Sequence, residues 1–244
     1  MVPIWAMIGR EKRHPYQVGD GLLSIRSMLR DMASKLPLRR YFPMSTAFSW
    51  PYRTPGIPDS AFERIPGIPM SPREVRVLVL SQLRLGENHC LWDIGAGTGT
   101  IAIEAAILCP KARVIAIERD AEVVSLIESN CRKFGLANVQ VIQGTAPDCL
   151  QHLSPAPDRI CIEGGHPLRE ILEACWSHLS PNGRAVATTN SLDELYGLSA
   201  GLAAVRARHV EVIQSAVNRL EHRGRTQMLL ALDPTFVLSG EKMG

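Results

Sequence analysis

The chain has 244 residues, and 45% of them are hydrophobic, which is enough for one large domain with a full core. No run approaches the roughly 18 apolar residues of a membrane span, and the N-terminus lacks the apolar stretch of a signal peptide. The six cysteines stand singly, without zinc-ligand spacing, so we expect a soluble, cytoplasmic protein with reduced thiols and no metal.

The positive charge is concentrated at the N-terminus. Residues 1–56 hold nine Lys and Arg against three acids, so the net charge of +3 for the whole chain leaves the remainder acidic. A nucleic-acid partner is therefore disfavoured. We predict a basic, disordered leader at residues 1–49 and one folded domain at 50–244. The leader has three interpretations: a flexible tail, an organelle transit peptide, or a segment upstream of a translation start at Met44.

An ordered pattern begins with the segment "TPGIPDSAFERIPGIPMS", whose prolines predict an extended arm. The next segment, "SPREVRVLVLSQLRL", predicts a helix. Ser71 is the expected N-cap, Pro72 stands at the first helical position, and Glu74 would complete a capping box.

Short apolar runs then alternate with helical stretches. The runs are "CLWDIG", "RVIAIE", "VQVIQG", "RICIEG" and "GRAVATT", and the expected helices cover residues 98–108, 120–134, 145–152, 166–179 and 191–204. This alternation is typical of a parallel sheet covered on both faces. The last two runs, "HVEVIQSAVNRL" and "RTQMLLALDPTFVLSG", have no helix between them and must pair antiparallel. The sequence thus predicts an α/β fold: a doubly wound, mostly parallel, seven-stranded sheet with a C-terminal antiparallel hairpin.

The segment "LWDIGAGTGT" follows the first predicted strand. Its three glycines leave room for a tight turn and for a ligand against the main chain, and the next helix presents free N–H groups there. Glu118 ends the second strand, where a carboxylate can accept both hydroxyls of a ribose. We therefore expect a ligand that contains a nucleoside.

The glycine spacing distinguishes two nucleoside cofactors. A dinucleotide fingerprint would require glycine at position 100, which is Thr100. The spacing D-x-G-x-G-x-G, with the terminal hairpin, instead resembles the class I methyltransferases, which implies S-adenosylmethionine as cofactor. Asp93 either caps the glycine turn or lies near the methionine end of the cofactor. Many members of the class place an acid after the third strand, where this chain has Thr145, so main-chain contacts at Gly144 and Ala146 are expected instead.

A narrower resemblance rests on several segments in order. The segments "GIPDSAF", "PMSPREVR", "DIGAGTGT", "GTAPDCL", "EGGHPLREIL", "VNRLEHRGRTQM" and "FVLSGEK" are similar to the decarboxylating precorrin-6B methyltransferases of cobalamin biosynthesis, the CbiT type. The resemblance covers about residues 50–244. It implies methylation of a meso carbon of precorrin-6B or cobalt-precorrin-6B and decarboxylation of an acetate side chain. It also implies a homotetramer, and a partner enzyme that methylates the other meso carbon.

The resemblance extends to individual residues. It implies cofactor contacts from Ser71, Gly95, Ala96, Gly97, Thr98, Gly99, Glu118 and Ala146. A substrate with many carboxylates calls for arginines, so Arg219, Arg223 and Arg225 are candidates, together with His166. Glu163 is a separate candidate for orienting the cofactor or the substrate. The arginines could also be solvated surface charges, His166 a helix cap and Glu163 a structural acid. No residue is assigned a catalytic role.

Two other functions remain open from the sequence. One is a tRNA or rRNA methyltransferase of the same fold. The other is a non-catalytic module in which the cofactor pocket serves assembly.

Overall fold

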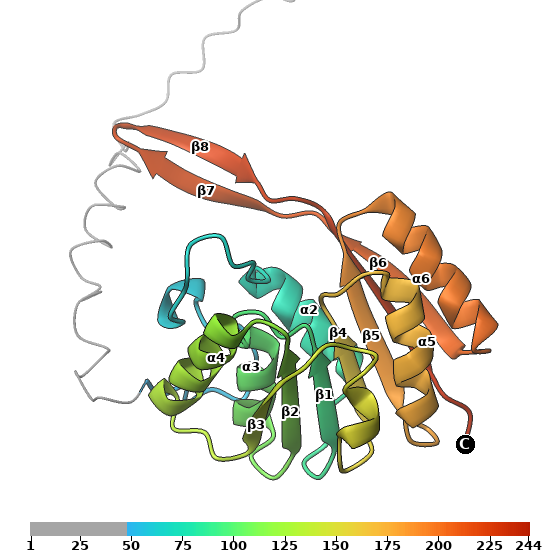
Figure 1. Ribbon diagram of the computed structural model, residues 1–244. Coiled ribbons are helices and arrows are strands. Elements are labelled where there is room, and N and C mark those ends of the chain that lie inside the picture. The colour runs from blue at the N-terminus through green and yellow to red at the C-terminus, as the bar shows by residue number, and fades with distance from the viewer. Residues whose placement is uncertain (1–47) are drawn as a thin grey trace, which may run out of the picture. The chain divides into compact units, whose positions relative to one another are not determined.

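Seven strands form one sheet with helices on both faces (Figure 1). The computed structural model describes residues 48–244. Predictions about residues 1–47, including the translation start at Met44, lie outside this range. Within it, no helix is long and apolar enough to cross a membrane.

The strand order is β3-β2-β1-β4-β5-β9-β6. The strands are β1 (Cys90–Ile94), β2 (Arg113–Glu118), β3 (Val139–Gln143), β4 (Arg159–Ile162), β5 (Arg184–Thr189), β6 (Arg208–Ser215) and β9 (Thr235–Glu241). The first five are parallel, and β9 pairs antiparallel with both β5 and β6. The predicted fold class is confirmed. The order reverses at β1, so the carboxyl ends of β1 and β4 form the edge where a ligand is expected.

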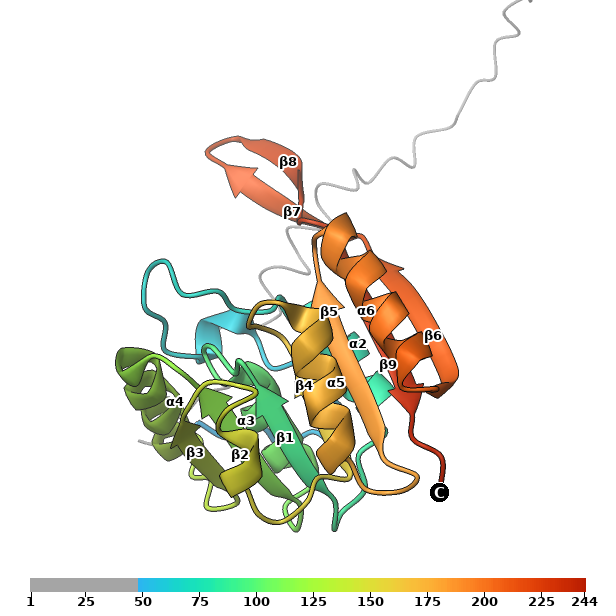
Figure 2. The same ribbon diagram turned by 45° about the vertical axis from the view of Figure 1, so that its right-hand side comes forward.

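Two helical layers cover the sheet. The helices are α2 (Arg73–Leu83), α3 (Thr100–Leu108), α4 (Ala121–Lys133), α5 (Leu168–His178) and α6 (Leu192–Ala204). Residues of α2, α3 and α4 share one core cluster with Leu91, whereas α5 and α6 share a second cluster with Trp92. Adjacent side chains of β1 therefore enter opposite layers, as strand geometry requires. Figure 2 shows α5 and α6 on the face turned toward the viewer.

Two local predictions are wrong. The predicted helix at residues 145–152 is only a 3₁₀ turn, η3 (Leu150–His152), because Pro147 disfavours helical geometry at the residue before it. The predicted capping box is also absent. Pro72 is the N-cap residue of α2 and no side chain caps the helix.

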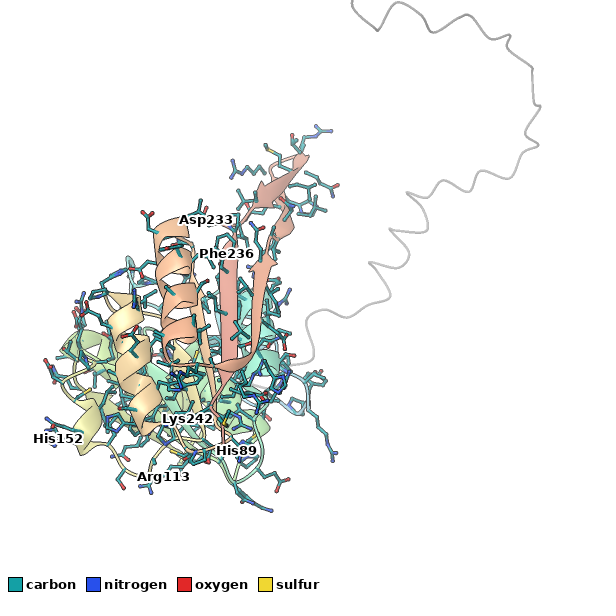
Figure 3. All side chains as sticks on the ribbon, turned by 90° about the vertical axis from the view of Figure 1, so that its right-hand side faces the viewer. His89, Arg113, His152, Asp233, Phe236 and Lys242 are labelled. Atoms are coloured by element: carbon teal, nitrogen blue, oxygen red, sulfur yellow. The ribbon has the colours of Figure 1, made fainter. Side chains whose placement is uncertain are left out.

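The C-terminal antiparallel segment extends beyond the seven-stranded sheet. Between β6 and β9 the chain forms a separate two-stranded ribbon, β7 (Asn218–Arg223) and β8 (Thr226–Ala231), which projects away from the sheet (Figure 1). In Figure 3, Asp233 and Phe236 mark the end of the sheet from which the ribbon leaves, and His89 and Arg113 mark the other end. Because β9 runs antiparallel to β5, the ribbon leaves from the carboxyl ends of the parallel strands.

Candidate functional site

The glycine turn lies at the carboxyl end of β1 and leads into α3. The N–H groups of Gly95 and Ala96 donate to the Ile117 carbonyl, which ties the turn to β2. Gly95 has a φ of +71°, and a Cβ there would lie 2.7 Å from the Cα of Gly164. Only glycine allows this approach of the β1 and β4 turns.

The other residues of the turn present their main chain. Gly97 has a φ of +53°, and a Cβ there would lie 3.3 Å from the Pro69 carbonyl oxygen. Gly99 is the N-cap of α3. The side chains of Ala96 and Thr98 are buried, and the Thr98 hydroxyl donates to the Pro69 carbonyl at 3.2 Å. A ligand at this turn would therefore meet backbone rather than side chains.

Glu118 lies beside the glycine turn, as its position at the end of β2 predicts. Its Oε2 accepts from the Gly97 N–H at 3.1 Å. Its Oε1 accepts from the N–H groups of Arg119 and Asp120 at 2.8 and 3.2 Å. These backbone donors hold the carboxylate in one orientation at the sheet edge.

Asp93 is completely buried at the end of β1. Its Oδ2 accepts from the Ala102 N–H at 3.1 Å, so the carboxylate does cap the first turn of α3. Its Oδ1 has no hydrogen-bond partner among the described residues. Burial, and then the nearby Glu163, raise the pKa of Asp93 well above its ordinary value. A buried oxygen without a partner is costly and indicates a place for a donor.

Ser71 and Glu163 meet at this edge from opposite directions in the chain. The Ser71 hydroxyl donates to Glu163 Oε1 at 2.6 Å. Burial raises the pKa of Glu163, although the Ser71 hydrogen bond and the charge of Arg76 oppose this effect. Ser71 therefore contacts a site residue rather than capping α2.

One atom each from Asp93, Cys161 and Glu163 lies within 4.8 Å of the other two. The atoms are of metal-ligating types. However, burial and then the charges of Glu163 and Asp93 raise the pKa of the Cys161 thiol well above its ordinary value, so the thiol stays protonated. We therefore interpret the cluster as one that holds protons. The prediction of no metal site stays a prediction.

A buried arginine that the sequence analysis did not predict binds Ser71, next to Glu163 at the carboxyl edge of the sheet. Arg76 of α2 is fully buried and ion-pairs with Glu104 of α3 and with Asp59 of the proline arm, at 2.7 Å each. It also donates to the Ser71 carbonyl at 2.7 Å. One sequence signal existed, because Arg76 lies on the face of α2 that carries the buried Val79 and is an odd residue for a core.

After β3, the cofactor contacts expected from Gly144 and Ala146 stay a prediction. The N–H of Gly144 donates to the Glu118 carbonyl at 2.9 Å, so it is engaged within the protein. A Cβ at Gly144 would lie 2.8 Å from the Cβ of Cys149, which explains glycine there without a ligand. Ala146 is half-buried and packs against the core cluster of α5 and α6.

The structure separates the three candidate arginines. Arg219, at the start of the ribbon, ion-pairs with Asp59 at 2.9 Å and with Glu74. The Arg219 hydrogen bond lowers the pKa of Glu74 to about 2. Arg223 and Arg225 are exposed at the turn end of the ribbon, which projects beyond the sheet edge (Figure 1).

His166 is not part of the cluster of Asp93, Cys161 and Glu163. Its Nδ1 is 2.8 Å from Glu194 Oε1, and its side chain is 79% exposed. Pro167, not His166, is the N-cap residue of α5. The predicted role as a cap is therefore wrong, and the predicted role in substrate binding stays a prediction.

A hollow elsewhere on the protein is unrelated to these residues. It lies between the N-terminal arm at Phe48 and Trp50 and the segment from Gly135 to Asn138 that precedes β3. None of the predicted site residues lines it.

Comparison with known proteins gives a consistent family. A family model described as "Precorrin methyltransferase domain" matches residues 63–239. The chain is 38% identical over 194 residues to a probable cobalt-precorrin-6B C(15)-methyltransferase (decarboxylating) of Pyrobaculum calidifontis, covering 78% of this chain and 98% of that protein. It is 32% identical to the enzyme of that name from Salmonella typhimurium, covering 75% and 95%.

Solved structures extend the comparison. A precorrin-6y C5,15-methyltransferase from Geobacter metallireducens superposes with a TM-score of 0.72 at 33% identity, covering 77% of this chain and 98% of that one. A tRNA (m1A58) methyltransferase from Aquifex aeolicus has a TM-score of 0.61 at 16% identity, covering 75% and 73%. The second similarity shows the shared fold alone.

Proposed function

The chain belongs to the precorrin methyltransferase family, and we propose that it methylates a meso carbon of precorrin-6B or cobalt-precorrin-6B, using S-adenosylmethionine, and decarboxylates an acetate side chain of that substrate. It is an enzyme of the methyltransferase class. The observation that carries the proposal is the site at the carboxyl ends of β1, β2 and β4, where Gly97, Glu118, Asp93 and Glu163 converge.

These residues fit the cofactor. Glu118 would accept from the ribose hydroxyls, because its carboxylate is held at the turn by backbone donors. The unpartnered Oδ1 of Asp93 would accept from the ammonium of the methionine end. Gly97 leaves the main chain open to the ligand. When bound, S-adenosylmethionine supplies an electrophilic methyl group on a sulfonium.

The protein must hold the tetrapyrrole in line with that methyl group. A meso carbon of the reduced ring is enamine-like and already nucleophilic, so positioning and exclusion of water matter more than a strong base. Arg223 and Arg225 could bind substrate carboxylates, because they are exposed near the end of the ribbon. Arg219 instead contributes by fixing the base of the ribbon to the proline arm.

An assembly and a partner enzyme belong to the same proposal. The ribbon exposes Leu220, Met228 and Leu229, and the edge strand β6 exposes Val210 and Val212. Exposed apolar side chains on a ribbon and an edge strand suit contacts between copies, and we propose a homotetramer. A second methyltransferase would act on the other meso carbon, and we place both in the cytoplasm.

Mass spectrometry tests the proposal directly. Purified protein is incubated with S-adenosylmethionine and precorrin-6B, or its cobalt form. We expect a product that has gained one methyl group and lost carbon dioxide. Titration calorimetry with Glu118→Ala and with the exposed control Glu122→Ala tests the cofactor site separately. A wild-type protein that binds the cofactor but leaves both substrates unchanged contradicts the assigned substrate.

A further inference from the structure

The proposed reaction requires two proton transfers that the cofactor does not carry out. The ring donates an electron pair to form the new C–CH₃ bond, and the CH₃–S bond breaks toward sulfur. The acetate then loses carbon dioxide, and its C–C bonding pair passes into the ring, which leaves an exocyclic methylene. The methylene carbon must gain a proton to become a methyl group, and the newly methylated meso carbon loses one as the ring regains conjugation. One carboxyl group that accepts the proton from the meso carbon and donates a proton to the methylene carbon balances both steps.

Glu163 has the right place for this role. It follows β4, and its N–H donates to the Ile94 carbonyl at 3.0 Å, directly before the glycine turn of β1. Its neighbour Gly164 is the residue against which Gly95 packs. The carboxyl group therefore stands at the edge where the proposed methyl donor and its acceptor meet.

The two oxygens of Glu163 have different environments. Oε1 accepts from the Ser71 hydroxyl at 2.6 Å, which fixes the orientation of the carboxyl group. Over residues 48–244, Oε2 accepts no hydrogen bond from the protein, and the side chain is half-buried rather than enclosed. One oxygen is thus anchored and the other is open to a ligand.

The surroundings of Glu163 favour a mobile proton. The groups that face it are Asp93 on β1, Cys161 on β4, Ser71 before α2 and Arg76 in the first turn of α2. Two carboxyl groups this close in a buried cluster cannot both ionise readily, so one of them stays protonated. Burial raises the pKa of Glu163, which brings it toward the neutral range where an acid–base group works.

We propose that Glu163 is a catalytic residue that takes the proton from the methylated meso carbon and delivers it to the carbon that has lost carbon dioxide. This inference rests on the proposed function. Asp93 is not the candidate for this role, because it is completely buried, its Oδ2 accepts from the Ala102 N–H and its Oδ1 is assigned to the ammonium of the proposed cofactor. Ser71 and Arg76 are positioning residues that set the orientation and charge of Glu163.

The test compares Glu163→Gln with the exposed control Glu170→Gln in the full chain. Calorimetry measures the affinity for S-adenosylmethionine, and single-turnover mass spectrometry in D₂O measures methylation, loss of carbon dioxide and deuterium gain. For Glu163→Gln we expect cofactor affinity within about threefold of wild type and a rate of complete conversion lower by about 10²–10⁴-fold, with deuterium incorporation delayed. Glu170→Gln should match wild type throughout.

A second variant covers the case in which Glu163→Gln fails to fold. Ser71→Ala removes a hydrogen bond that lowers the pKa of Glu163, so the limb of the pH–rate profile that reports this group should move to higher pH. A merely structural role would leave the position of that limb unchanged.

The outcomes separate the two hypotheses. A folded Glu163→Gln variant with wild-type turnover overturns the catalytic role alone. An equal fall in cofactor affinity and in rate, or an unmoved pH limb in Ser71→Ala, also overturns it. A wild-type enzyme that converts neither form of the substrate overturns the proposed function, and the role of Glu163 with it.

Discussion

Replacing Gly95 by alanine tests whether the β1 and β4 turns need their close approach. The added Cβ would lie 2.7 Å from the Cα of Gly164 and 2.9 Å from its nitrogen, and the backbone has a φ of +71°. Gly135, which follows α4, is the matched control. It has a φ of +68°, but an added Cβ meets nothing within 4 Å.

The difference between the two variants isolates the clash. A left-handed backbone costs an alanine about 1–2 kcal/mol, and a small gain from the stiffer unfolded chain offsets part of this in both variants. We therefore expect Gly135→Ala to lose about 1 kcal/mol. Gly95→Ala adds overpacking against a main chain that cannot rotate away, worth about 1–3 kcal/mol more. Since 1 kcal/mol shifts the Tm by roughly 2–4 °C in a domain of this size, thermal unfolding resolves the two.

Urea unfolding and cofactor calorimetry measure the two consequences. Gly95→Ala should also weaken binding of S-adenosylmethionine by about tenfold or more, because a displaced Gly164 moves the adjacent Glu163 and widens the turn. Gly135→Ala should leave cofactor affinity unchanged. Equal stability loss in both variants would refute the reasoning, since it would mean that the β4 turn yields without cost.

Three further changes probe the site and its support. Glu118→Ala should weaken S-adenosylmethionine binding by about 1.5–3 kcal/mol, measured by calorimetry, because a charge-assisted pair to the ribose is lost. Arg76→Met should lower the free energy of unfolding in urea by about 3–5 kcal/mol, since it leaves the buried Glu104 without its partner; adding Glu104→Gln should recover part of the loss, and a cost below about 1 kcal/mol would contradict the role of the pair. Arg219→Gln should flatten the acid side of the pH–stability curve: Glu74 has a folded pKa of about 2 against an ordinary value of 4.5, so its contribution is present above pH 4.5 and is lost as the pH falls toward 2. Because both side chains are about a third exposed, that contribution is about 1 kcal/mol, and identical curves for the variant and wild type would remove it.

The fold was predictable because its signals are local. Each parallel strand is a short apolar run, and such runs separated by helices are typical of a parallel sheet covered on both faces. The sequence did not specify that β9 enters between β5 and β6, because apolar runs do not state their neighbours. The ribbon of β7 and β8 was missed for a related reason. Its residues read as a continuation of the adjacent strands, and only the pairing register separates them.

The parts of the candidate site that lie close together in the chain could be predicted from local patterns, as the strands could. Gly95, Gly97 and Asp93 lie in one segment, and Glu118 is found by counting one strand further. The contact between Ser71 and Glu163 spans 92 positions in the chain, and no pattern in either segment indicates the other. The local pattern therefore predicts a cap at Ser71, which is the usual role of a serine before a helix, but no side chain caps α2. The cofactor contact that the resemblance implies for Ser71 stays a prediction.

The arginines show how chain order can group residues that the fold separates. Arg219 and Arg223 are both in the segment "VNRLEHRG", which suggested one shared role, yet Arg219 binds Asp59 and Glu74 whereas Arg223 lies near the far end of the ribbon. Asp59 in turn accepts from Arg76, which holds the Ser71 carbonyl, so a continuous set of contacts joins the base of the ribbon to Glu163. Contiguity alone does not establish coupling. The charge that acts on Glu163 is that of Arg76, which lowers the pKa of Glu163, whereas Arg219 acts on Asp59 and Glu74. Among residues 48–244, Arg76 is thus the one residue that contacts both Asp59, which binds the ribbon, and Ser71, which binds Glu163.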